Sequence, residues 1–295
     1  MKVSEAGSVK VKLVHCNSSI SDPNNRSVMK TSMLIAIGLL LSSRTAFAQA
    51  GAADTPSESE SGTHSAADLQ RALPNVAYAY TANGASYKTI GLQAYGLGMA
   101  ARDQDPVIGG GGAVWGSPVR RLTLIVDVHR NASRAFSPSA AAIVTMYQNE
   151  GFTLGALGKF KIDGFAGGPD RDEVESEVEI GGLASYGLYG WYADLNAIGG
   201  RGTGDDGETD VEGRLRMGRA VVPWLRVGVD GQARVRIAGP RYLPNGRTWD
   251  FVGGAQAIVN GNSFFGSLTA GPTTTGLLSK NVGWTVVASV GGVAF

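Results

Sequence analysis

Several residue types that define common functional sites are scarce in this chain of 295 residues. Cys16 is its only cysteine, which excludes a disulfide framework and a cysteine-based zinc site. Lys and Arg together number 26 against 25 for Asp and Glu. This balance excludes the strong positive charge that would point to nucleic-acid binding. After residue 76 the sequence has no run of 18 apolar residues, so a transmembrane helix is excluded there.

The N-terminal region contains a stretch that fits a secretory signal peptide, residues 29–48, which read MKTSMLIAIGLLLSSRTAFA. Lys30 supplies a positive charge, and the apolar run Met33–Leu41 follows it. The tripeptide at 46–48 fits the small-residue rule for cleavage, so we expect the mature chain to begin at Gln49.

The residues on either side of this signal peptide are polar and carry no strand or helix pattern. Because the signal starts at the internal Met29, we interpret residues 1–28 as an over-extended, unstructured start. Residues 49–75 are small and serine-rich, which predicts a flexible periplasmic lead-in before a folded domain over residues 76–295.

From residue 76 onward, hydrophobic residues recur every second position, which is typical of β-strands with two different faces. In 225–237, LRVGVDGQARVRI, apolar or small residues alternate with four charges and a glutamine. Apolar exceptions on the polar faces are Ile125, Leu157, Val252 and Ile258. We predict twelve strands, near 86–101, 107–115, 119–130, 137–148, 152–163, 174–185, 188–199, 210–221, 224–237, 247–259, 263–271 and 283–295.

The links between these strands alternate in length, with turns such as Tyr186-Gly187 and Val222-Pro223 between longer polar links. This asymmetry favours a transmembrane antiparallel up-and-down β-barrel of about twelve strands (range 10–12), with short periplasmic turns and longer outer loops. Aromatic residues near the strand ends predict two interface girdles. Those beside the short turns are Trp115, Tyr147, Phe152, Tyr189, Trp191, Trp224 and Phe264, and those toward the other end are Phe160, Trp249, Phe251 and Trp284.

The chain ends in an uncharged strand, GWTVVASVGGVAF, whose last residue is Phe295. With the signal peptide and the link asymmetry, residues 76–295 resemble the bacterial outer-membrane β-barrel proteins. The resemblance implies the outer membrane of a Gram-negative bacterium, contact with its lipid and lipopolysaccharide, and insertion by a machinery that recognises the last strand. A soluble secreted β-barrel or sandwich is the alternative, because it would bury the apolar face instead.

In the barrel interpretation the charged faces point inward and pair across strands. A loop centred near Gly168 would place Lys161 opposite Glu175 and Lys159 opposite Glu177. The tight turn at Val222-Pro223 would place Arg216 opposite Asp230, Glu212 opposite Arg234 and Asp210 opposite Arg236. The candidate lumen-lining residues are Lys159, Lys161, Glu175, Glu177, Glu179, Glu212, Arg214, Arg216, Arg226, Asp230, Arg234 and Arg236.

These charges leave two functions open. They could impose a field on a narrow porin-like channel for small hydrophilic solutes, or neutralise one another in a closed barrel that serves as an anchor, adhesin or structural element. Nothing in residues 76–295 resembles a plug domain, which favours the channel, although the lead-in 49–75 could thread the lumen and gate it.

We predict no catalytic, metal or cofactor site and expect that the protein is not an enzyme. Asp127 and His129 with Ser133 or Ser137 could be drawn as a triad, but neither G-x-S-x-G nor H-E-x-x-H occurs. The acidic residues of the outer links lack EF-hand spacing, so we expect a solvated surface there rather than a calcium loop.

Overall fold

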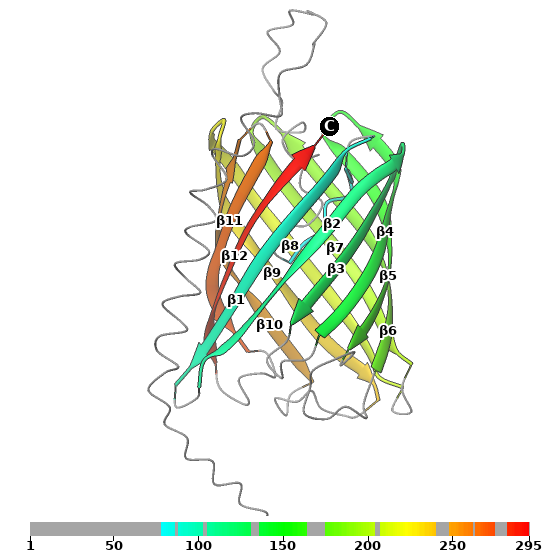
Figure 1. Ribbon diagram of the computed structural model, residues 1–295, viewed down its shortest axis with the longest axis vertical. Coiled ribbons are helices and arrows are strands. Elements are labelled where there is room, and N and C mark those ends of the chain that lie inside the picture. Colours follow the sequence, from blue (N-terminus) through cyan, green and yellow to red (C-terminus); the bar gives the residue numbers. More distant parts are fainter. Residues whose placement is uncertain are drawn as a thin grey trace, which may run out of the picture. The chain divides into compact units, whose positions relative to one another are not determined.

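The described strands form one closed antiparallel sheet, in which sequence neighbours pair and β1 pairs with β12 (Figure 1). The computed structural model describes residues 78–85, 88–102, 105–130, 136–163, 175–203, 207–239, 248–261, 263–274 and 282–294. Our predictions for residues 1–28, 29–48 and 49–75 and for Phe295 lie outside these ranges. No helix within them is long and apolar enough to cross a membrane.

Twelve strands occupy the described ranges, as the hydrophobic alternation predicts, and most ends lie within three residues of the expected ones. Their bounds are β1 Ile90–Ala101, β2 Val107–Val119, β3 Leu122–Arg130, β4 Phe136–Asn149, β5 Phe152–Asp163, β6 Glu175–Leu188, β7 Trp191–Gly202, β8 Thr209–Val222, β9 Leu225–Ala238, β10 Trp249–Asn260, β11 Phe264–Thr273 and β12 Gly283–Ala294.

The period of two places apolar side chains outside the barrel and polar side chains inside it. Ile180 is 69% exposed whereas its neighbour Glu179 is 5% exposed, and Leu195 is 57% exposed whereas Asn196 is 1% exposed. A soluble barrel or sandwich requires the reverse, because water would face the apolar side. The soluble alternative is therefore wrong.

Link lengths differ between the two ends of the barrel. At one end the links have two or three residues, and at the other they have five to eleven. The turn between β6 and β7 is Tyr189-Gly190, whose φ values of 52° and 81° suit a two-residue hairpin. The predicted turn at Tyr186-Gly187 is wrong, because both residues continue β6 and pair with β7.

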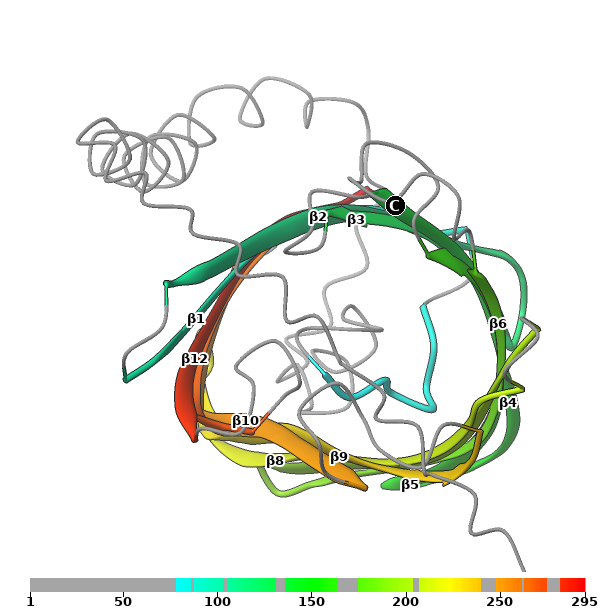
Figure 2. The ribbon, with the colours of Figure 1, turned by 90° about the horizontal axis from the view of Figure 1, so that it is seen from below.

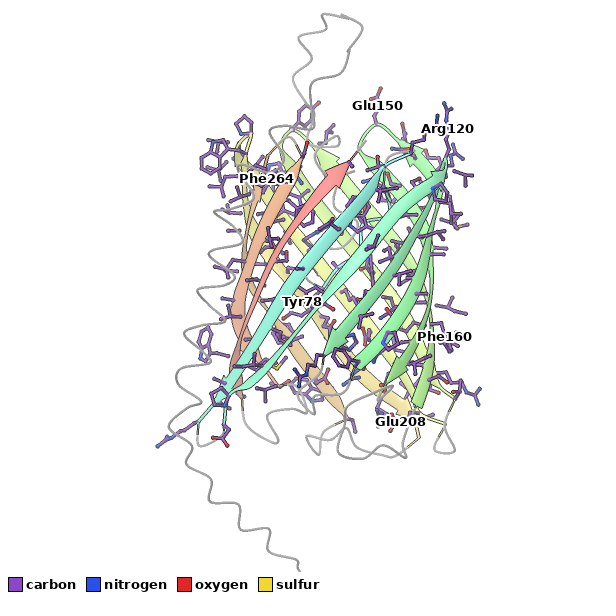
Figure 3. The ribbon with its side chains drawn as sticks, in the orientation of Figure 1. Tyr78, Arg120, Glu150, Phe160, Glu208 and Phe264 are labelled. Atoms are coloured by element: carbon purple, nitrogen blue, oxygen red, sulfur yellow. The ribbon has the colours of Figure 1, made fainter. Side chains whose placement is uncertain are left out.

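Outward aromatic side chains gather near both ends of the strands. In Figure 3, Phe264 lies beside the short turns and Phe160 toward the long links. Trp191 and Trp224, also beside short turns, are half-exposed. Trp115 is an exception to the predicted girdle, because it faces inward and is only 2% exposed. This arrangement is typical of a barrel whose aromatic residues lie at two membrane interfaces.

Candidate functional site

The segment Tyr78–Ala85, which precedes β1, lies inside the barrel rather than in its wall (Figure 2). Ala79, Thr81 and Ala82 have no exposed surface. The expectation that residues 76–295 contain nothing like a plug is therefore wrong for this segment. We call it the lumenal segment.

The inner wall binds the main chain of the lumenal segment at its centre. The Tyr80 N–H donates to Asn196 Oδ1 at 2.7 Å, and Asn196 Nδ2 donates back to the Tyr80 carbonyl at 2.9 Å. Two residues further, the Ala82 N–H donates to Ser185 Oγ at 2.8 Å. Thr145 Oγ1 donates to the Ala82 carbonyl at 2.8 Å. Side chains of the wall thereby bond the N–H and the carbonyl of both Tyr80 and Ala82.

Each end of the lumenal segment is bound in the same way. The Tyr78 N–H donates to Asp230 Oδ2 at 3.1 Å, and Arg214 donates to the Tyr78 carbonyl at 3.3 Å. At the other end, the Ala85 N–H donates to Thr123 Oγ1 at 2.7 Å. Thr153 adds a hydrogen bond to the Asn83 side chain. Counted with the contacts at the centre of the segment, one residue from each of seven consecutive strands, β3 to β9, bonds the segment.

An apolar cluster inside the barrel packs against the lumenal segment. Its wall members include Ile125, Ile143, Leu157, Leu183 and Ile198, together with Trp115, and its segment members are Tyr80, Ala82 and Ala85. Ile125 and Leu157 are two of the apolar residues that break the alternation on the polar faces. Inward apolar residues were thus the one sequence signal that something packs inside the barrel. The other two exceptions, Val252 and Ile258, are also inward and buried, and Ile258 packs on Phe265.

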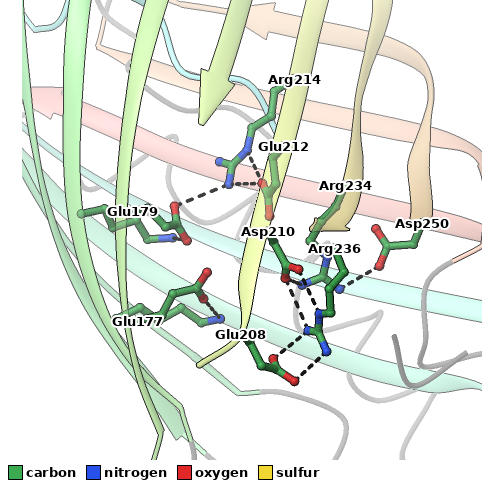
Figure 4. A network of polar contacts seen from close by, with 11 residues as sticks. Glu177, Glu179, Glu208, Asp210, Glu212, Arg214, Arg234, Arg236 and Asp250 are labelled. Carbon is green, nitrogen blue, oxygen red and sulfur yellow. Dashed lines mark hydrogen bonds and ion pairs between the residues drawn. The ribbon is translucent and has the colours of Figure 1, made fainter. Parts of the chain in front are cut away.

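Charged residues of β5, β6 and β8 form a network on the same inner wall (Figure 4). Lys159 Nζ lies 3.1 Å from Glu179 Oε1, and Lys161 Nζ lies 3.6 Å from Glu177 Oε2. Arg214 joins the two sides, because its Nη2 lies 2.7 Å from Glu212 Oε2 and 3.7 Å from Glu179 Oε2. These charge-assisted contacts link neighbouring strands inside the barrel.

The network continues over β8, β9 and β10. Arg236 holds two carboxylates, Glu208 at 2.6 Å and Asp210 at 3.0 Å. Arg234 lies 2.7 Å from Asp250 and 3.7 Å from Asp210. Glu208 is about one-third exposed, so this part of the network reaches the end of the barrel that carries the long links (Figures 3 and 4).

A second, fully buried ion pair contacts the lumenal segment through Ser185. Arg216 Nη2 lies 2.7 Å from Asp194 Oδ2, and the two side chains are 3% and 0% exposed. Ser185 Oγ donates to Asp194 Oδ1 at 2.6 Å and accepts the Ala82 N–H. The carboxylate of Asp194 therefore orients the hydroxyl that binds the lumenal segment.

The remaining side of the inner wall carries no charge. Four consecutive strands, β11, β12, β1 and β2, contain no Asp, Glu, Lys or Arg within their bounds. Their buried polar groups include Thr269, which accepts from Gln256 Nε2 at 3.2 Å, and the pair Ser267 and Ser289, whose hydroxyls are 2.6 Å apart. The lumen thus has one charged side and one neutral, hydroxyl-bearing side.

Inward aromatic side chains of the wall lie over glycines of the neighbouring strand. A side chain on Gly91 would collide with the ring of Trp115, and one on Gly291 with the ring of Phe265. The same relation pairs Tyr95 with Gly111 and Tyr192 with Gly218. Each aromatic residue is the direct register partner of its glycine. The rings therefore lie along the wall, because the glycine leaves room for them there.

The structure brings the predicted lumen residues together, with one change of register. Across the β8–β9 turn, Arg216 pairs with Asp230, Glu212 with Arg234 and Asp210 with Arg236, as predicted. Between β5 and β6, Lys159 pairs with Glu179 and Lys161 with Glu177, so the predicted β5–β6 pairs were wrong by two residues. Glu175 begins β6, but its side chain lies outside the described residues. Arg226 is buried, with its guanidinium 5.4 Å from the Tyr192 ring centroid.

Eight side chains that make the contacts described above were missing from the predicted set: Thr123, Thr145, Thr153, Ser185, Asp194, Asn196, Glu208 and Asp250. Asp194 and Asn196 alternate with Leu195, so the strand pattern placed them on the polar face. Their importance could not be read from that pattern, because it comes from the lumenal segment they support.

Asp127 and His129 face the lumen but do not form a catalytic triad. Ser139 Oγ donates to Asp127 Oδ1 at 2.8 Å, and His129 Nδ1 lies 3.9 Å from the same oxygen. Ser139 was not part of the predicted triad. Ser137, the described serine that was, is the register partner of His129, but its buried Oγ has no hydrogen-bond partner among the described residues, so the hydrogen bond between nucleophile and base is not formed. Ser133 lies outside the described residues.

No protein-family model matches the sequence, and no curated protein matches it. Among solved structures, the NanC porin superposes with a TM-score of 0.52 at 7% identity, over 68% of this chain and 98% of that one. The KdgM porin, solved in complex with disordered oligogalacturonate, has a TM-score of 0.49 at 8% identity, over 70% and 99%. An outer-membrane channel from Pseudomonas putida F1 has a TM-score of 0.45 at 12% identity, over 80% and 100%.

The fold and the distribution of side chains define the class of the protein. A closed barrel of twelve antiparallel strands, apolar outside and polar inside, with aromatic residues near both ends, is an outer-membrane β-barrel. It is a barrel of the Gram-negative outer membrane, so the short turns face the periplasm and the long links face outward.

Proposed function

We propose that the protein is a narrow channel for small hydrophilic solutes. One observation carries this proposal: besides its apolar cluster, the inner wall bears polar side chains on every side, including strands beyond those that bind the lumenal segment. The neutral side carries hydroxyl and amide groups such as Thr269, Ser267 and Gln93, which an interior filled only by apolar packing would not need. Water and small polar solutes are the natural neighbours of such a wall.

The shape of the wall supports the same function. Tyr95, Trp115, Tyr192 and Phe265 lie against neighbouring glycines, so their rings take up less of the cross-section than rings that project inward. Twelve strands give a lumen between the filled interior of eight strands and the open channel of sixteen. We propose passive transport rather than catalysis, because Ser137, which lies opposite His129 in the sheet, makes no hydrogen bond to it.

A closed structural barrel is the second candidate, and the lumenal segment is the observation that favours it. Tyr78–Ala85 is bound along β3 to β9, and the ion pairs beside it neutralise each other. A barrel that remains blocked by this segment would serve as an anchor or adhesin without passing solutes.

Ion selectivity in a planar bilayer separates the two candidates. Changing both Glu177→Gln and Glu179→Gln removes two negative charges, namely the carboxylates that lie 3.1 Å from Lys159 Nζ and 3.6 Å from Lys161 Nζ. The lumen becomes more positive, so the reversal potential in a salt gradient should shift toward anion selectivity.

Glu150→Gln is the matched control, because Glu150 is exposed in a periplasmic turn and should leave the reversal potential unchanged. Open events whose selectivity moves only with the lumenal pair support the channel. A folded barrel without open events, or a reversal potential unmoved by the double variant, would favour the closed barrel.

A further inference from the structure

The inner wall of β3 to β9 has the properties of a peptide-binding site. One polar side chain from each of these seven strands contacts the lumenal segment: Thr123, Thr145, Thr153, Ser185, Asn196, Arg214 and Asp230. We infer that this wall is a groove for a peptide of mainly small residues that turns at Ala82 and Asn83, with Tyr78–Ala85 as its tethered ligand.

Recognition is directed mainly at the main chain of the peptide. Six of the seven wall residues bond its N–H or carbonyl groups, and Asn196 bonds both groups of one residue. Main-chain hydrogen bonds are the usual source of affinity for extended peptides, whereas side-chain pockets provide specificity. A separate peptide that follows the same main-chain path makes the same bonds, but its binding also costs the translational and rotational freedom that the tether has already removed.

The fit requires small residues at defined positions. Gly84 has a φ of +61°, and a side chain there would collide with Thr123 Oγ1. On the wall, Gly155 faces Ala82, and a Cβ on Gly155 would lie 3.3 Å from the Ala82 carbonyl oxygen. Missing side chains on both partners therefore allow the two backbones to approach each other.

One position of the groove selects an aromatic residue. The Arg214 guanidinium lies 5.2 Å from the centroid of the Tyr80 ring, which is within the range of a cation–π contact. Tyr80 is 5% exposed and belongs to the apolar cluster of the wall. The ligand class is thus a peptide of mainly small residues that contains a turn and has Tyr80 as its aromatic anchor.

The tether explains why a separate peptide would rarely compete in the intact protein. A short linker holds its ligand at an effective concentration of about millimolar. Exchange becomes measurable once the tethered copy is removed. The inference goes beyond the proposed function, because binding can be measured whether or not the barrel conducts.

Fluorescence anisotropy tests the inference with a barrel that lacks residues 49–85, folded in detergent micelles. The probe is the labelled, end-blocked peptide YAYTANGA, which corresponds to Tyr78–Ala85. We expect saturable binding to this barrel and much weaker binding to the full-length protein. A peptide methylated at the nitrogen of Tyr80 should bind at least about fivefold more weakly, because one main-chain hydrogen bond is lost.

Wall variants in the same shortened barrel localise the binding site. Asn196→Ala removes two bonds to the peptide and should weaken binding at least about fivefold. Ser267→Ala is the matched control on the neutral wall and should leave the affinity unchanged, because Ser267 bonds Ser289 and not the segment. Absence of saturable binding to a folded barrel, or equal losses from both variants, would overturn the inference.

A disulfide in the full-length protein keeps the test decisive if the shortened barrel does not fold. Cysteines at Ala82 and Ser185 should form a disulfide under oxidation, since the Ala82 nitrogen lies 2.8 Å from Ser185 Oγ. Cysteines at Ala82 and Ser267 should not. Failure of the first pair to cross-link in a folded barrel would show that the groove does not hold the segment.

Discussion

The buried pair of Arg216 and Asp194 gives the sharpest energetic prediction. Asp194→Asn removes the charge that faces Arg216 at 2.7 Å and keeps the shape of the side chain. The guanidinium is 3% exposed, so it stays buried and loses its nearest carboxylate, which leaves its register partner Asp230 as the acidic group beside it. Breaking a buried pair in this way costs about 3–5 kcal/mol of unfolding free energy.

The exposed part of the network provides the comparison. Glu208→Gln breaks an ion pair with Arg236, but Glu208 is 34% exposed and water can replace it. We expect a loss of at most about 1 kcal/mol there. Reversible urea unfolding in lipid vesicles, followed by tryptophan fluorescence, measures both variants against the parent barrel.

A double variant separates charge from packing. Asp194→Asn combined with Arg216→Met removes both charges and should recover most of the stability lost by Asp194→Asn alone. If Asp194→Asn costs less than about 1 kcal/mol, water reaches this pair as it reaches a surface ion pair. That result would refute the conclusion that water is excluded from the Arg216–Asp194 pair.

The other predictions concern location and orientation. Val286→Arg puts a charge on the outward face and should cost about 2–4 kcal/mol, whereas Val286→Leu should be tolerated; equal stability of the two would contradict the lipid-facing assignment. On intact cells, an impermeant thiol reagent should label Asp105→Cys in an outer link but not Glu150→Cys in a periplasmic turn, and reversed labelling would show the opposite orientation. Mass spectrometry should find a mature chain that begins at Gln49, and an uncleaved precursor in the outer membrane would contradict the predicted signal peptide.

The alternation of apolar and polar residues was sufficient to predict the barrel architecture, because each strand has one lipid-facing and one lumenal side. Register was predictable only where a tight turn joins two strands. The Arg216–Asp230 pair was correct because two residues separate β8 from β9. The Lys161–Glu175 pair was wrong because eleven residues separate β5 from β6, and a link of that length does not determine which residues face each other.

The lumenal segment could not be predicted by the same reasoning. Its residues follow no strand alternation, and its main-chain groups bond side chains from six strands of the wall. The inward position of Ile125 and Leu157 was visible in the sequence as a break in the alternation. The break alone did not reveal what these residues contact. In the closed barrel they pack in one cluster with Tyr80 and Ala82 of the lumenal segment.

Single-channel conductance of the barrel with and without residues 49–85 tests the central claim most directly. The claim is that the barrel is a conduit partly occupied by its own chain. We predict that the shortened barrel conducts more than the full-length protein and that added YAYTANGA peptide lowers its conductance again. Equal conductance of the two forms, with no effect of the peptide, would contradict the account.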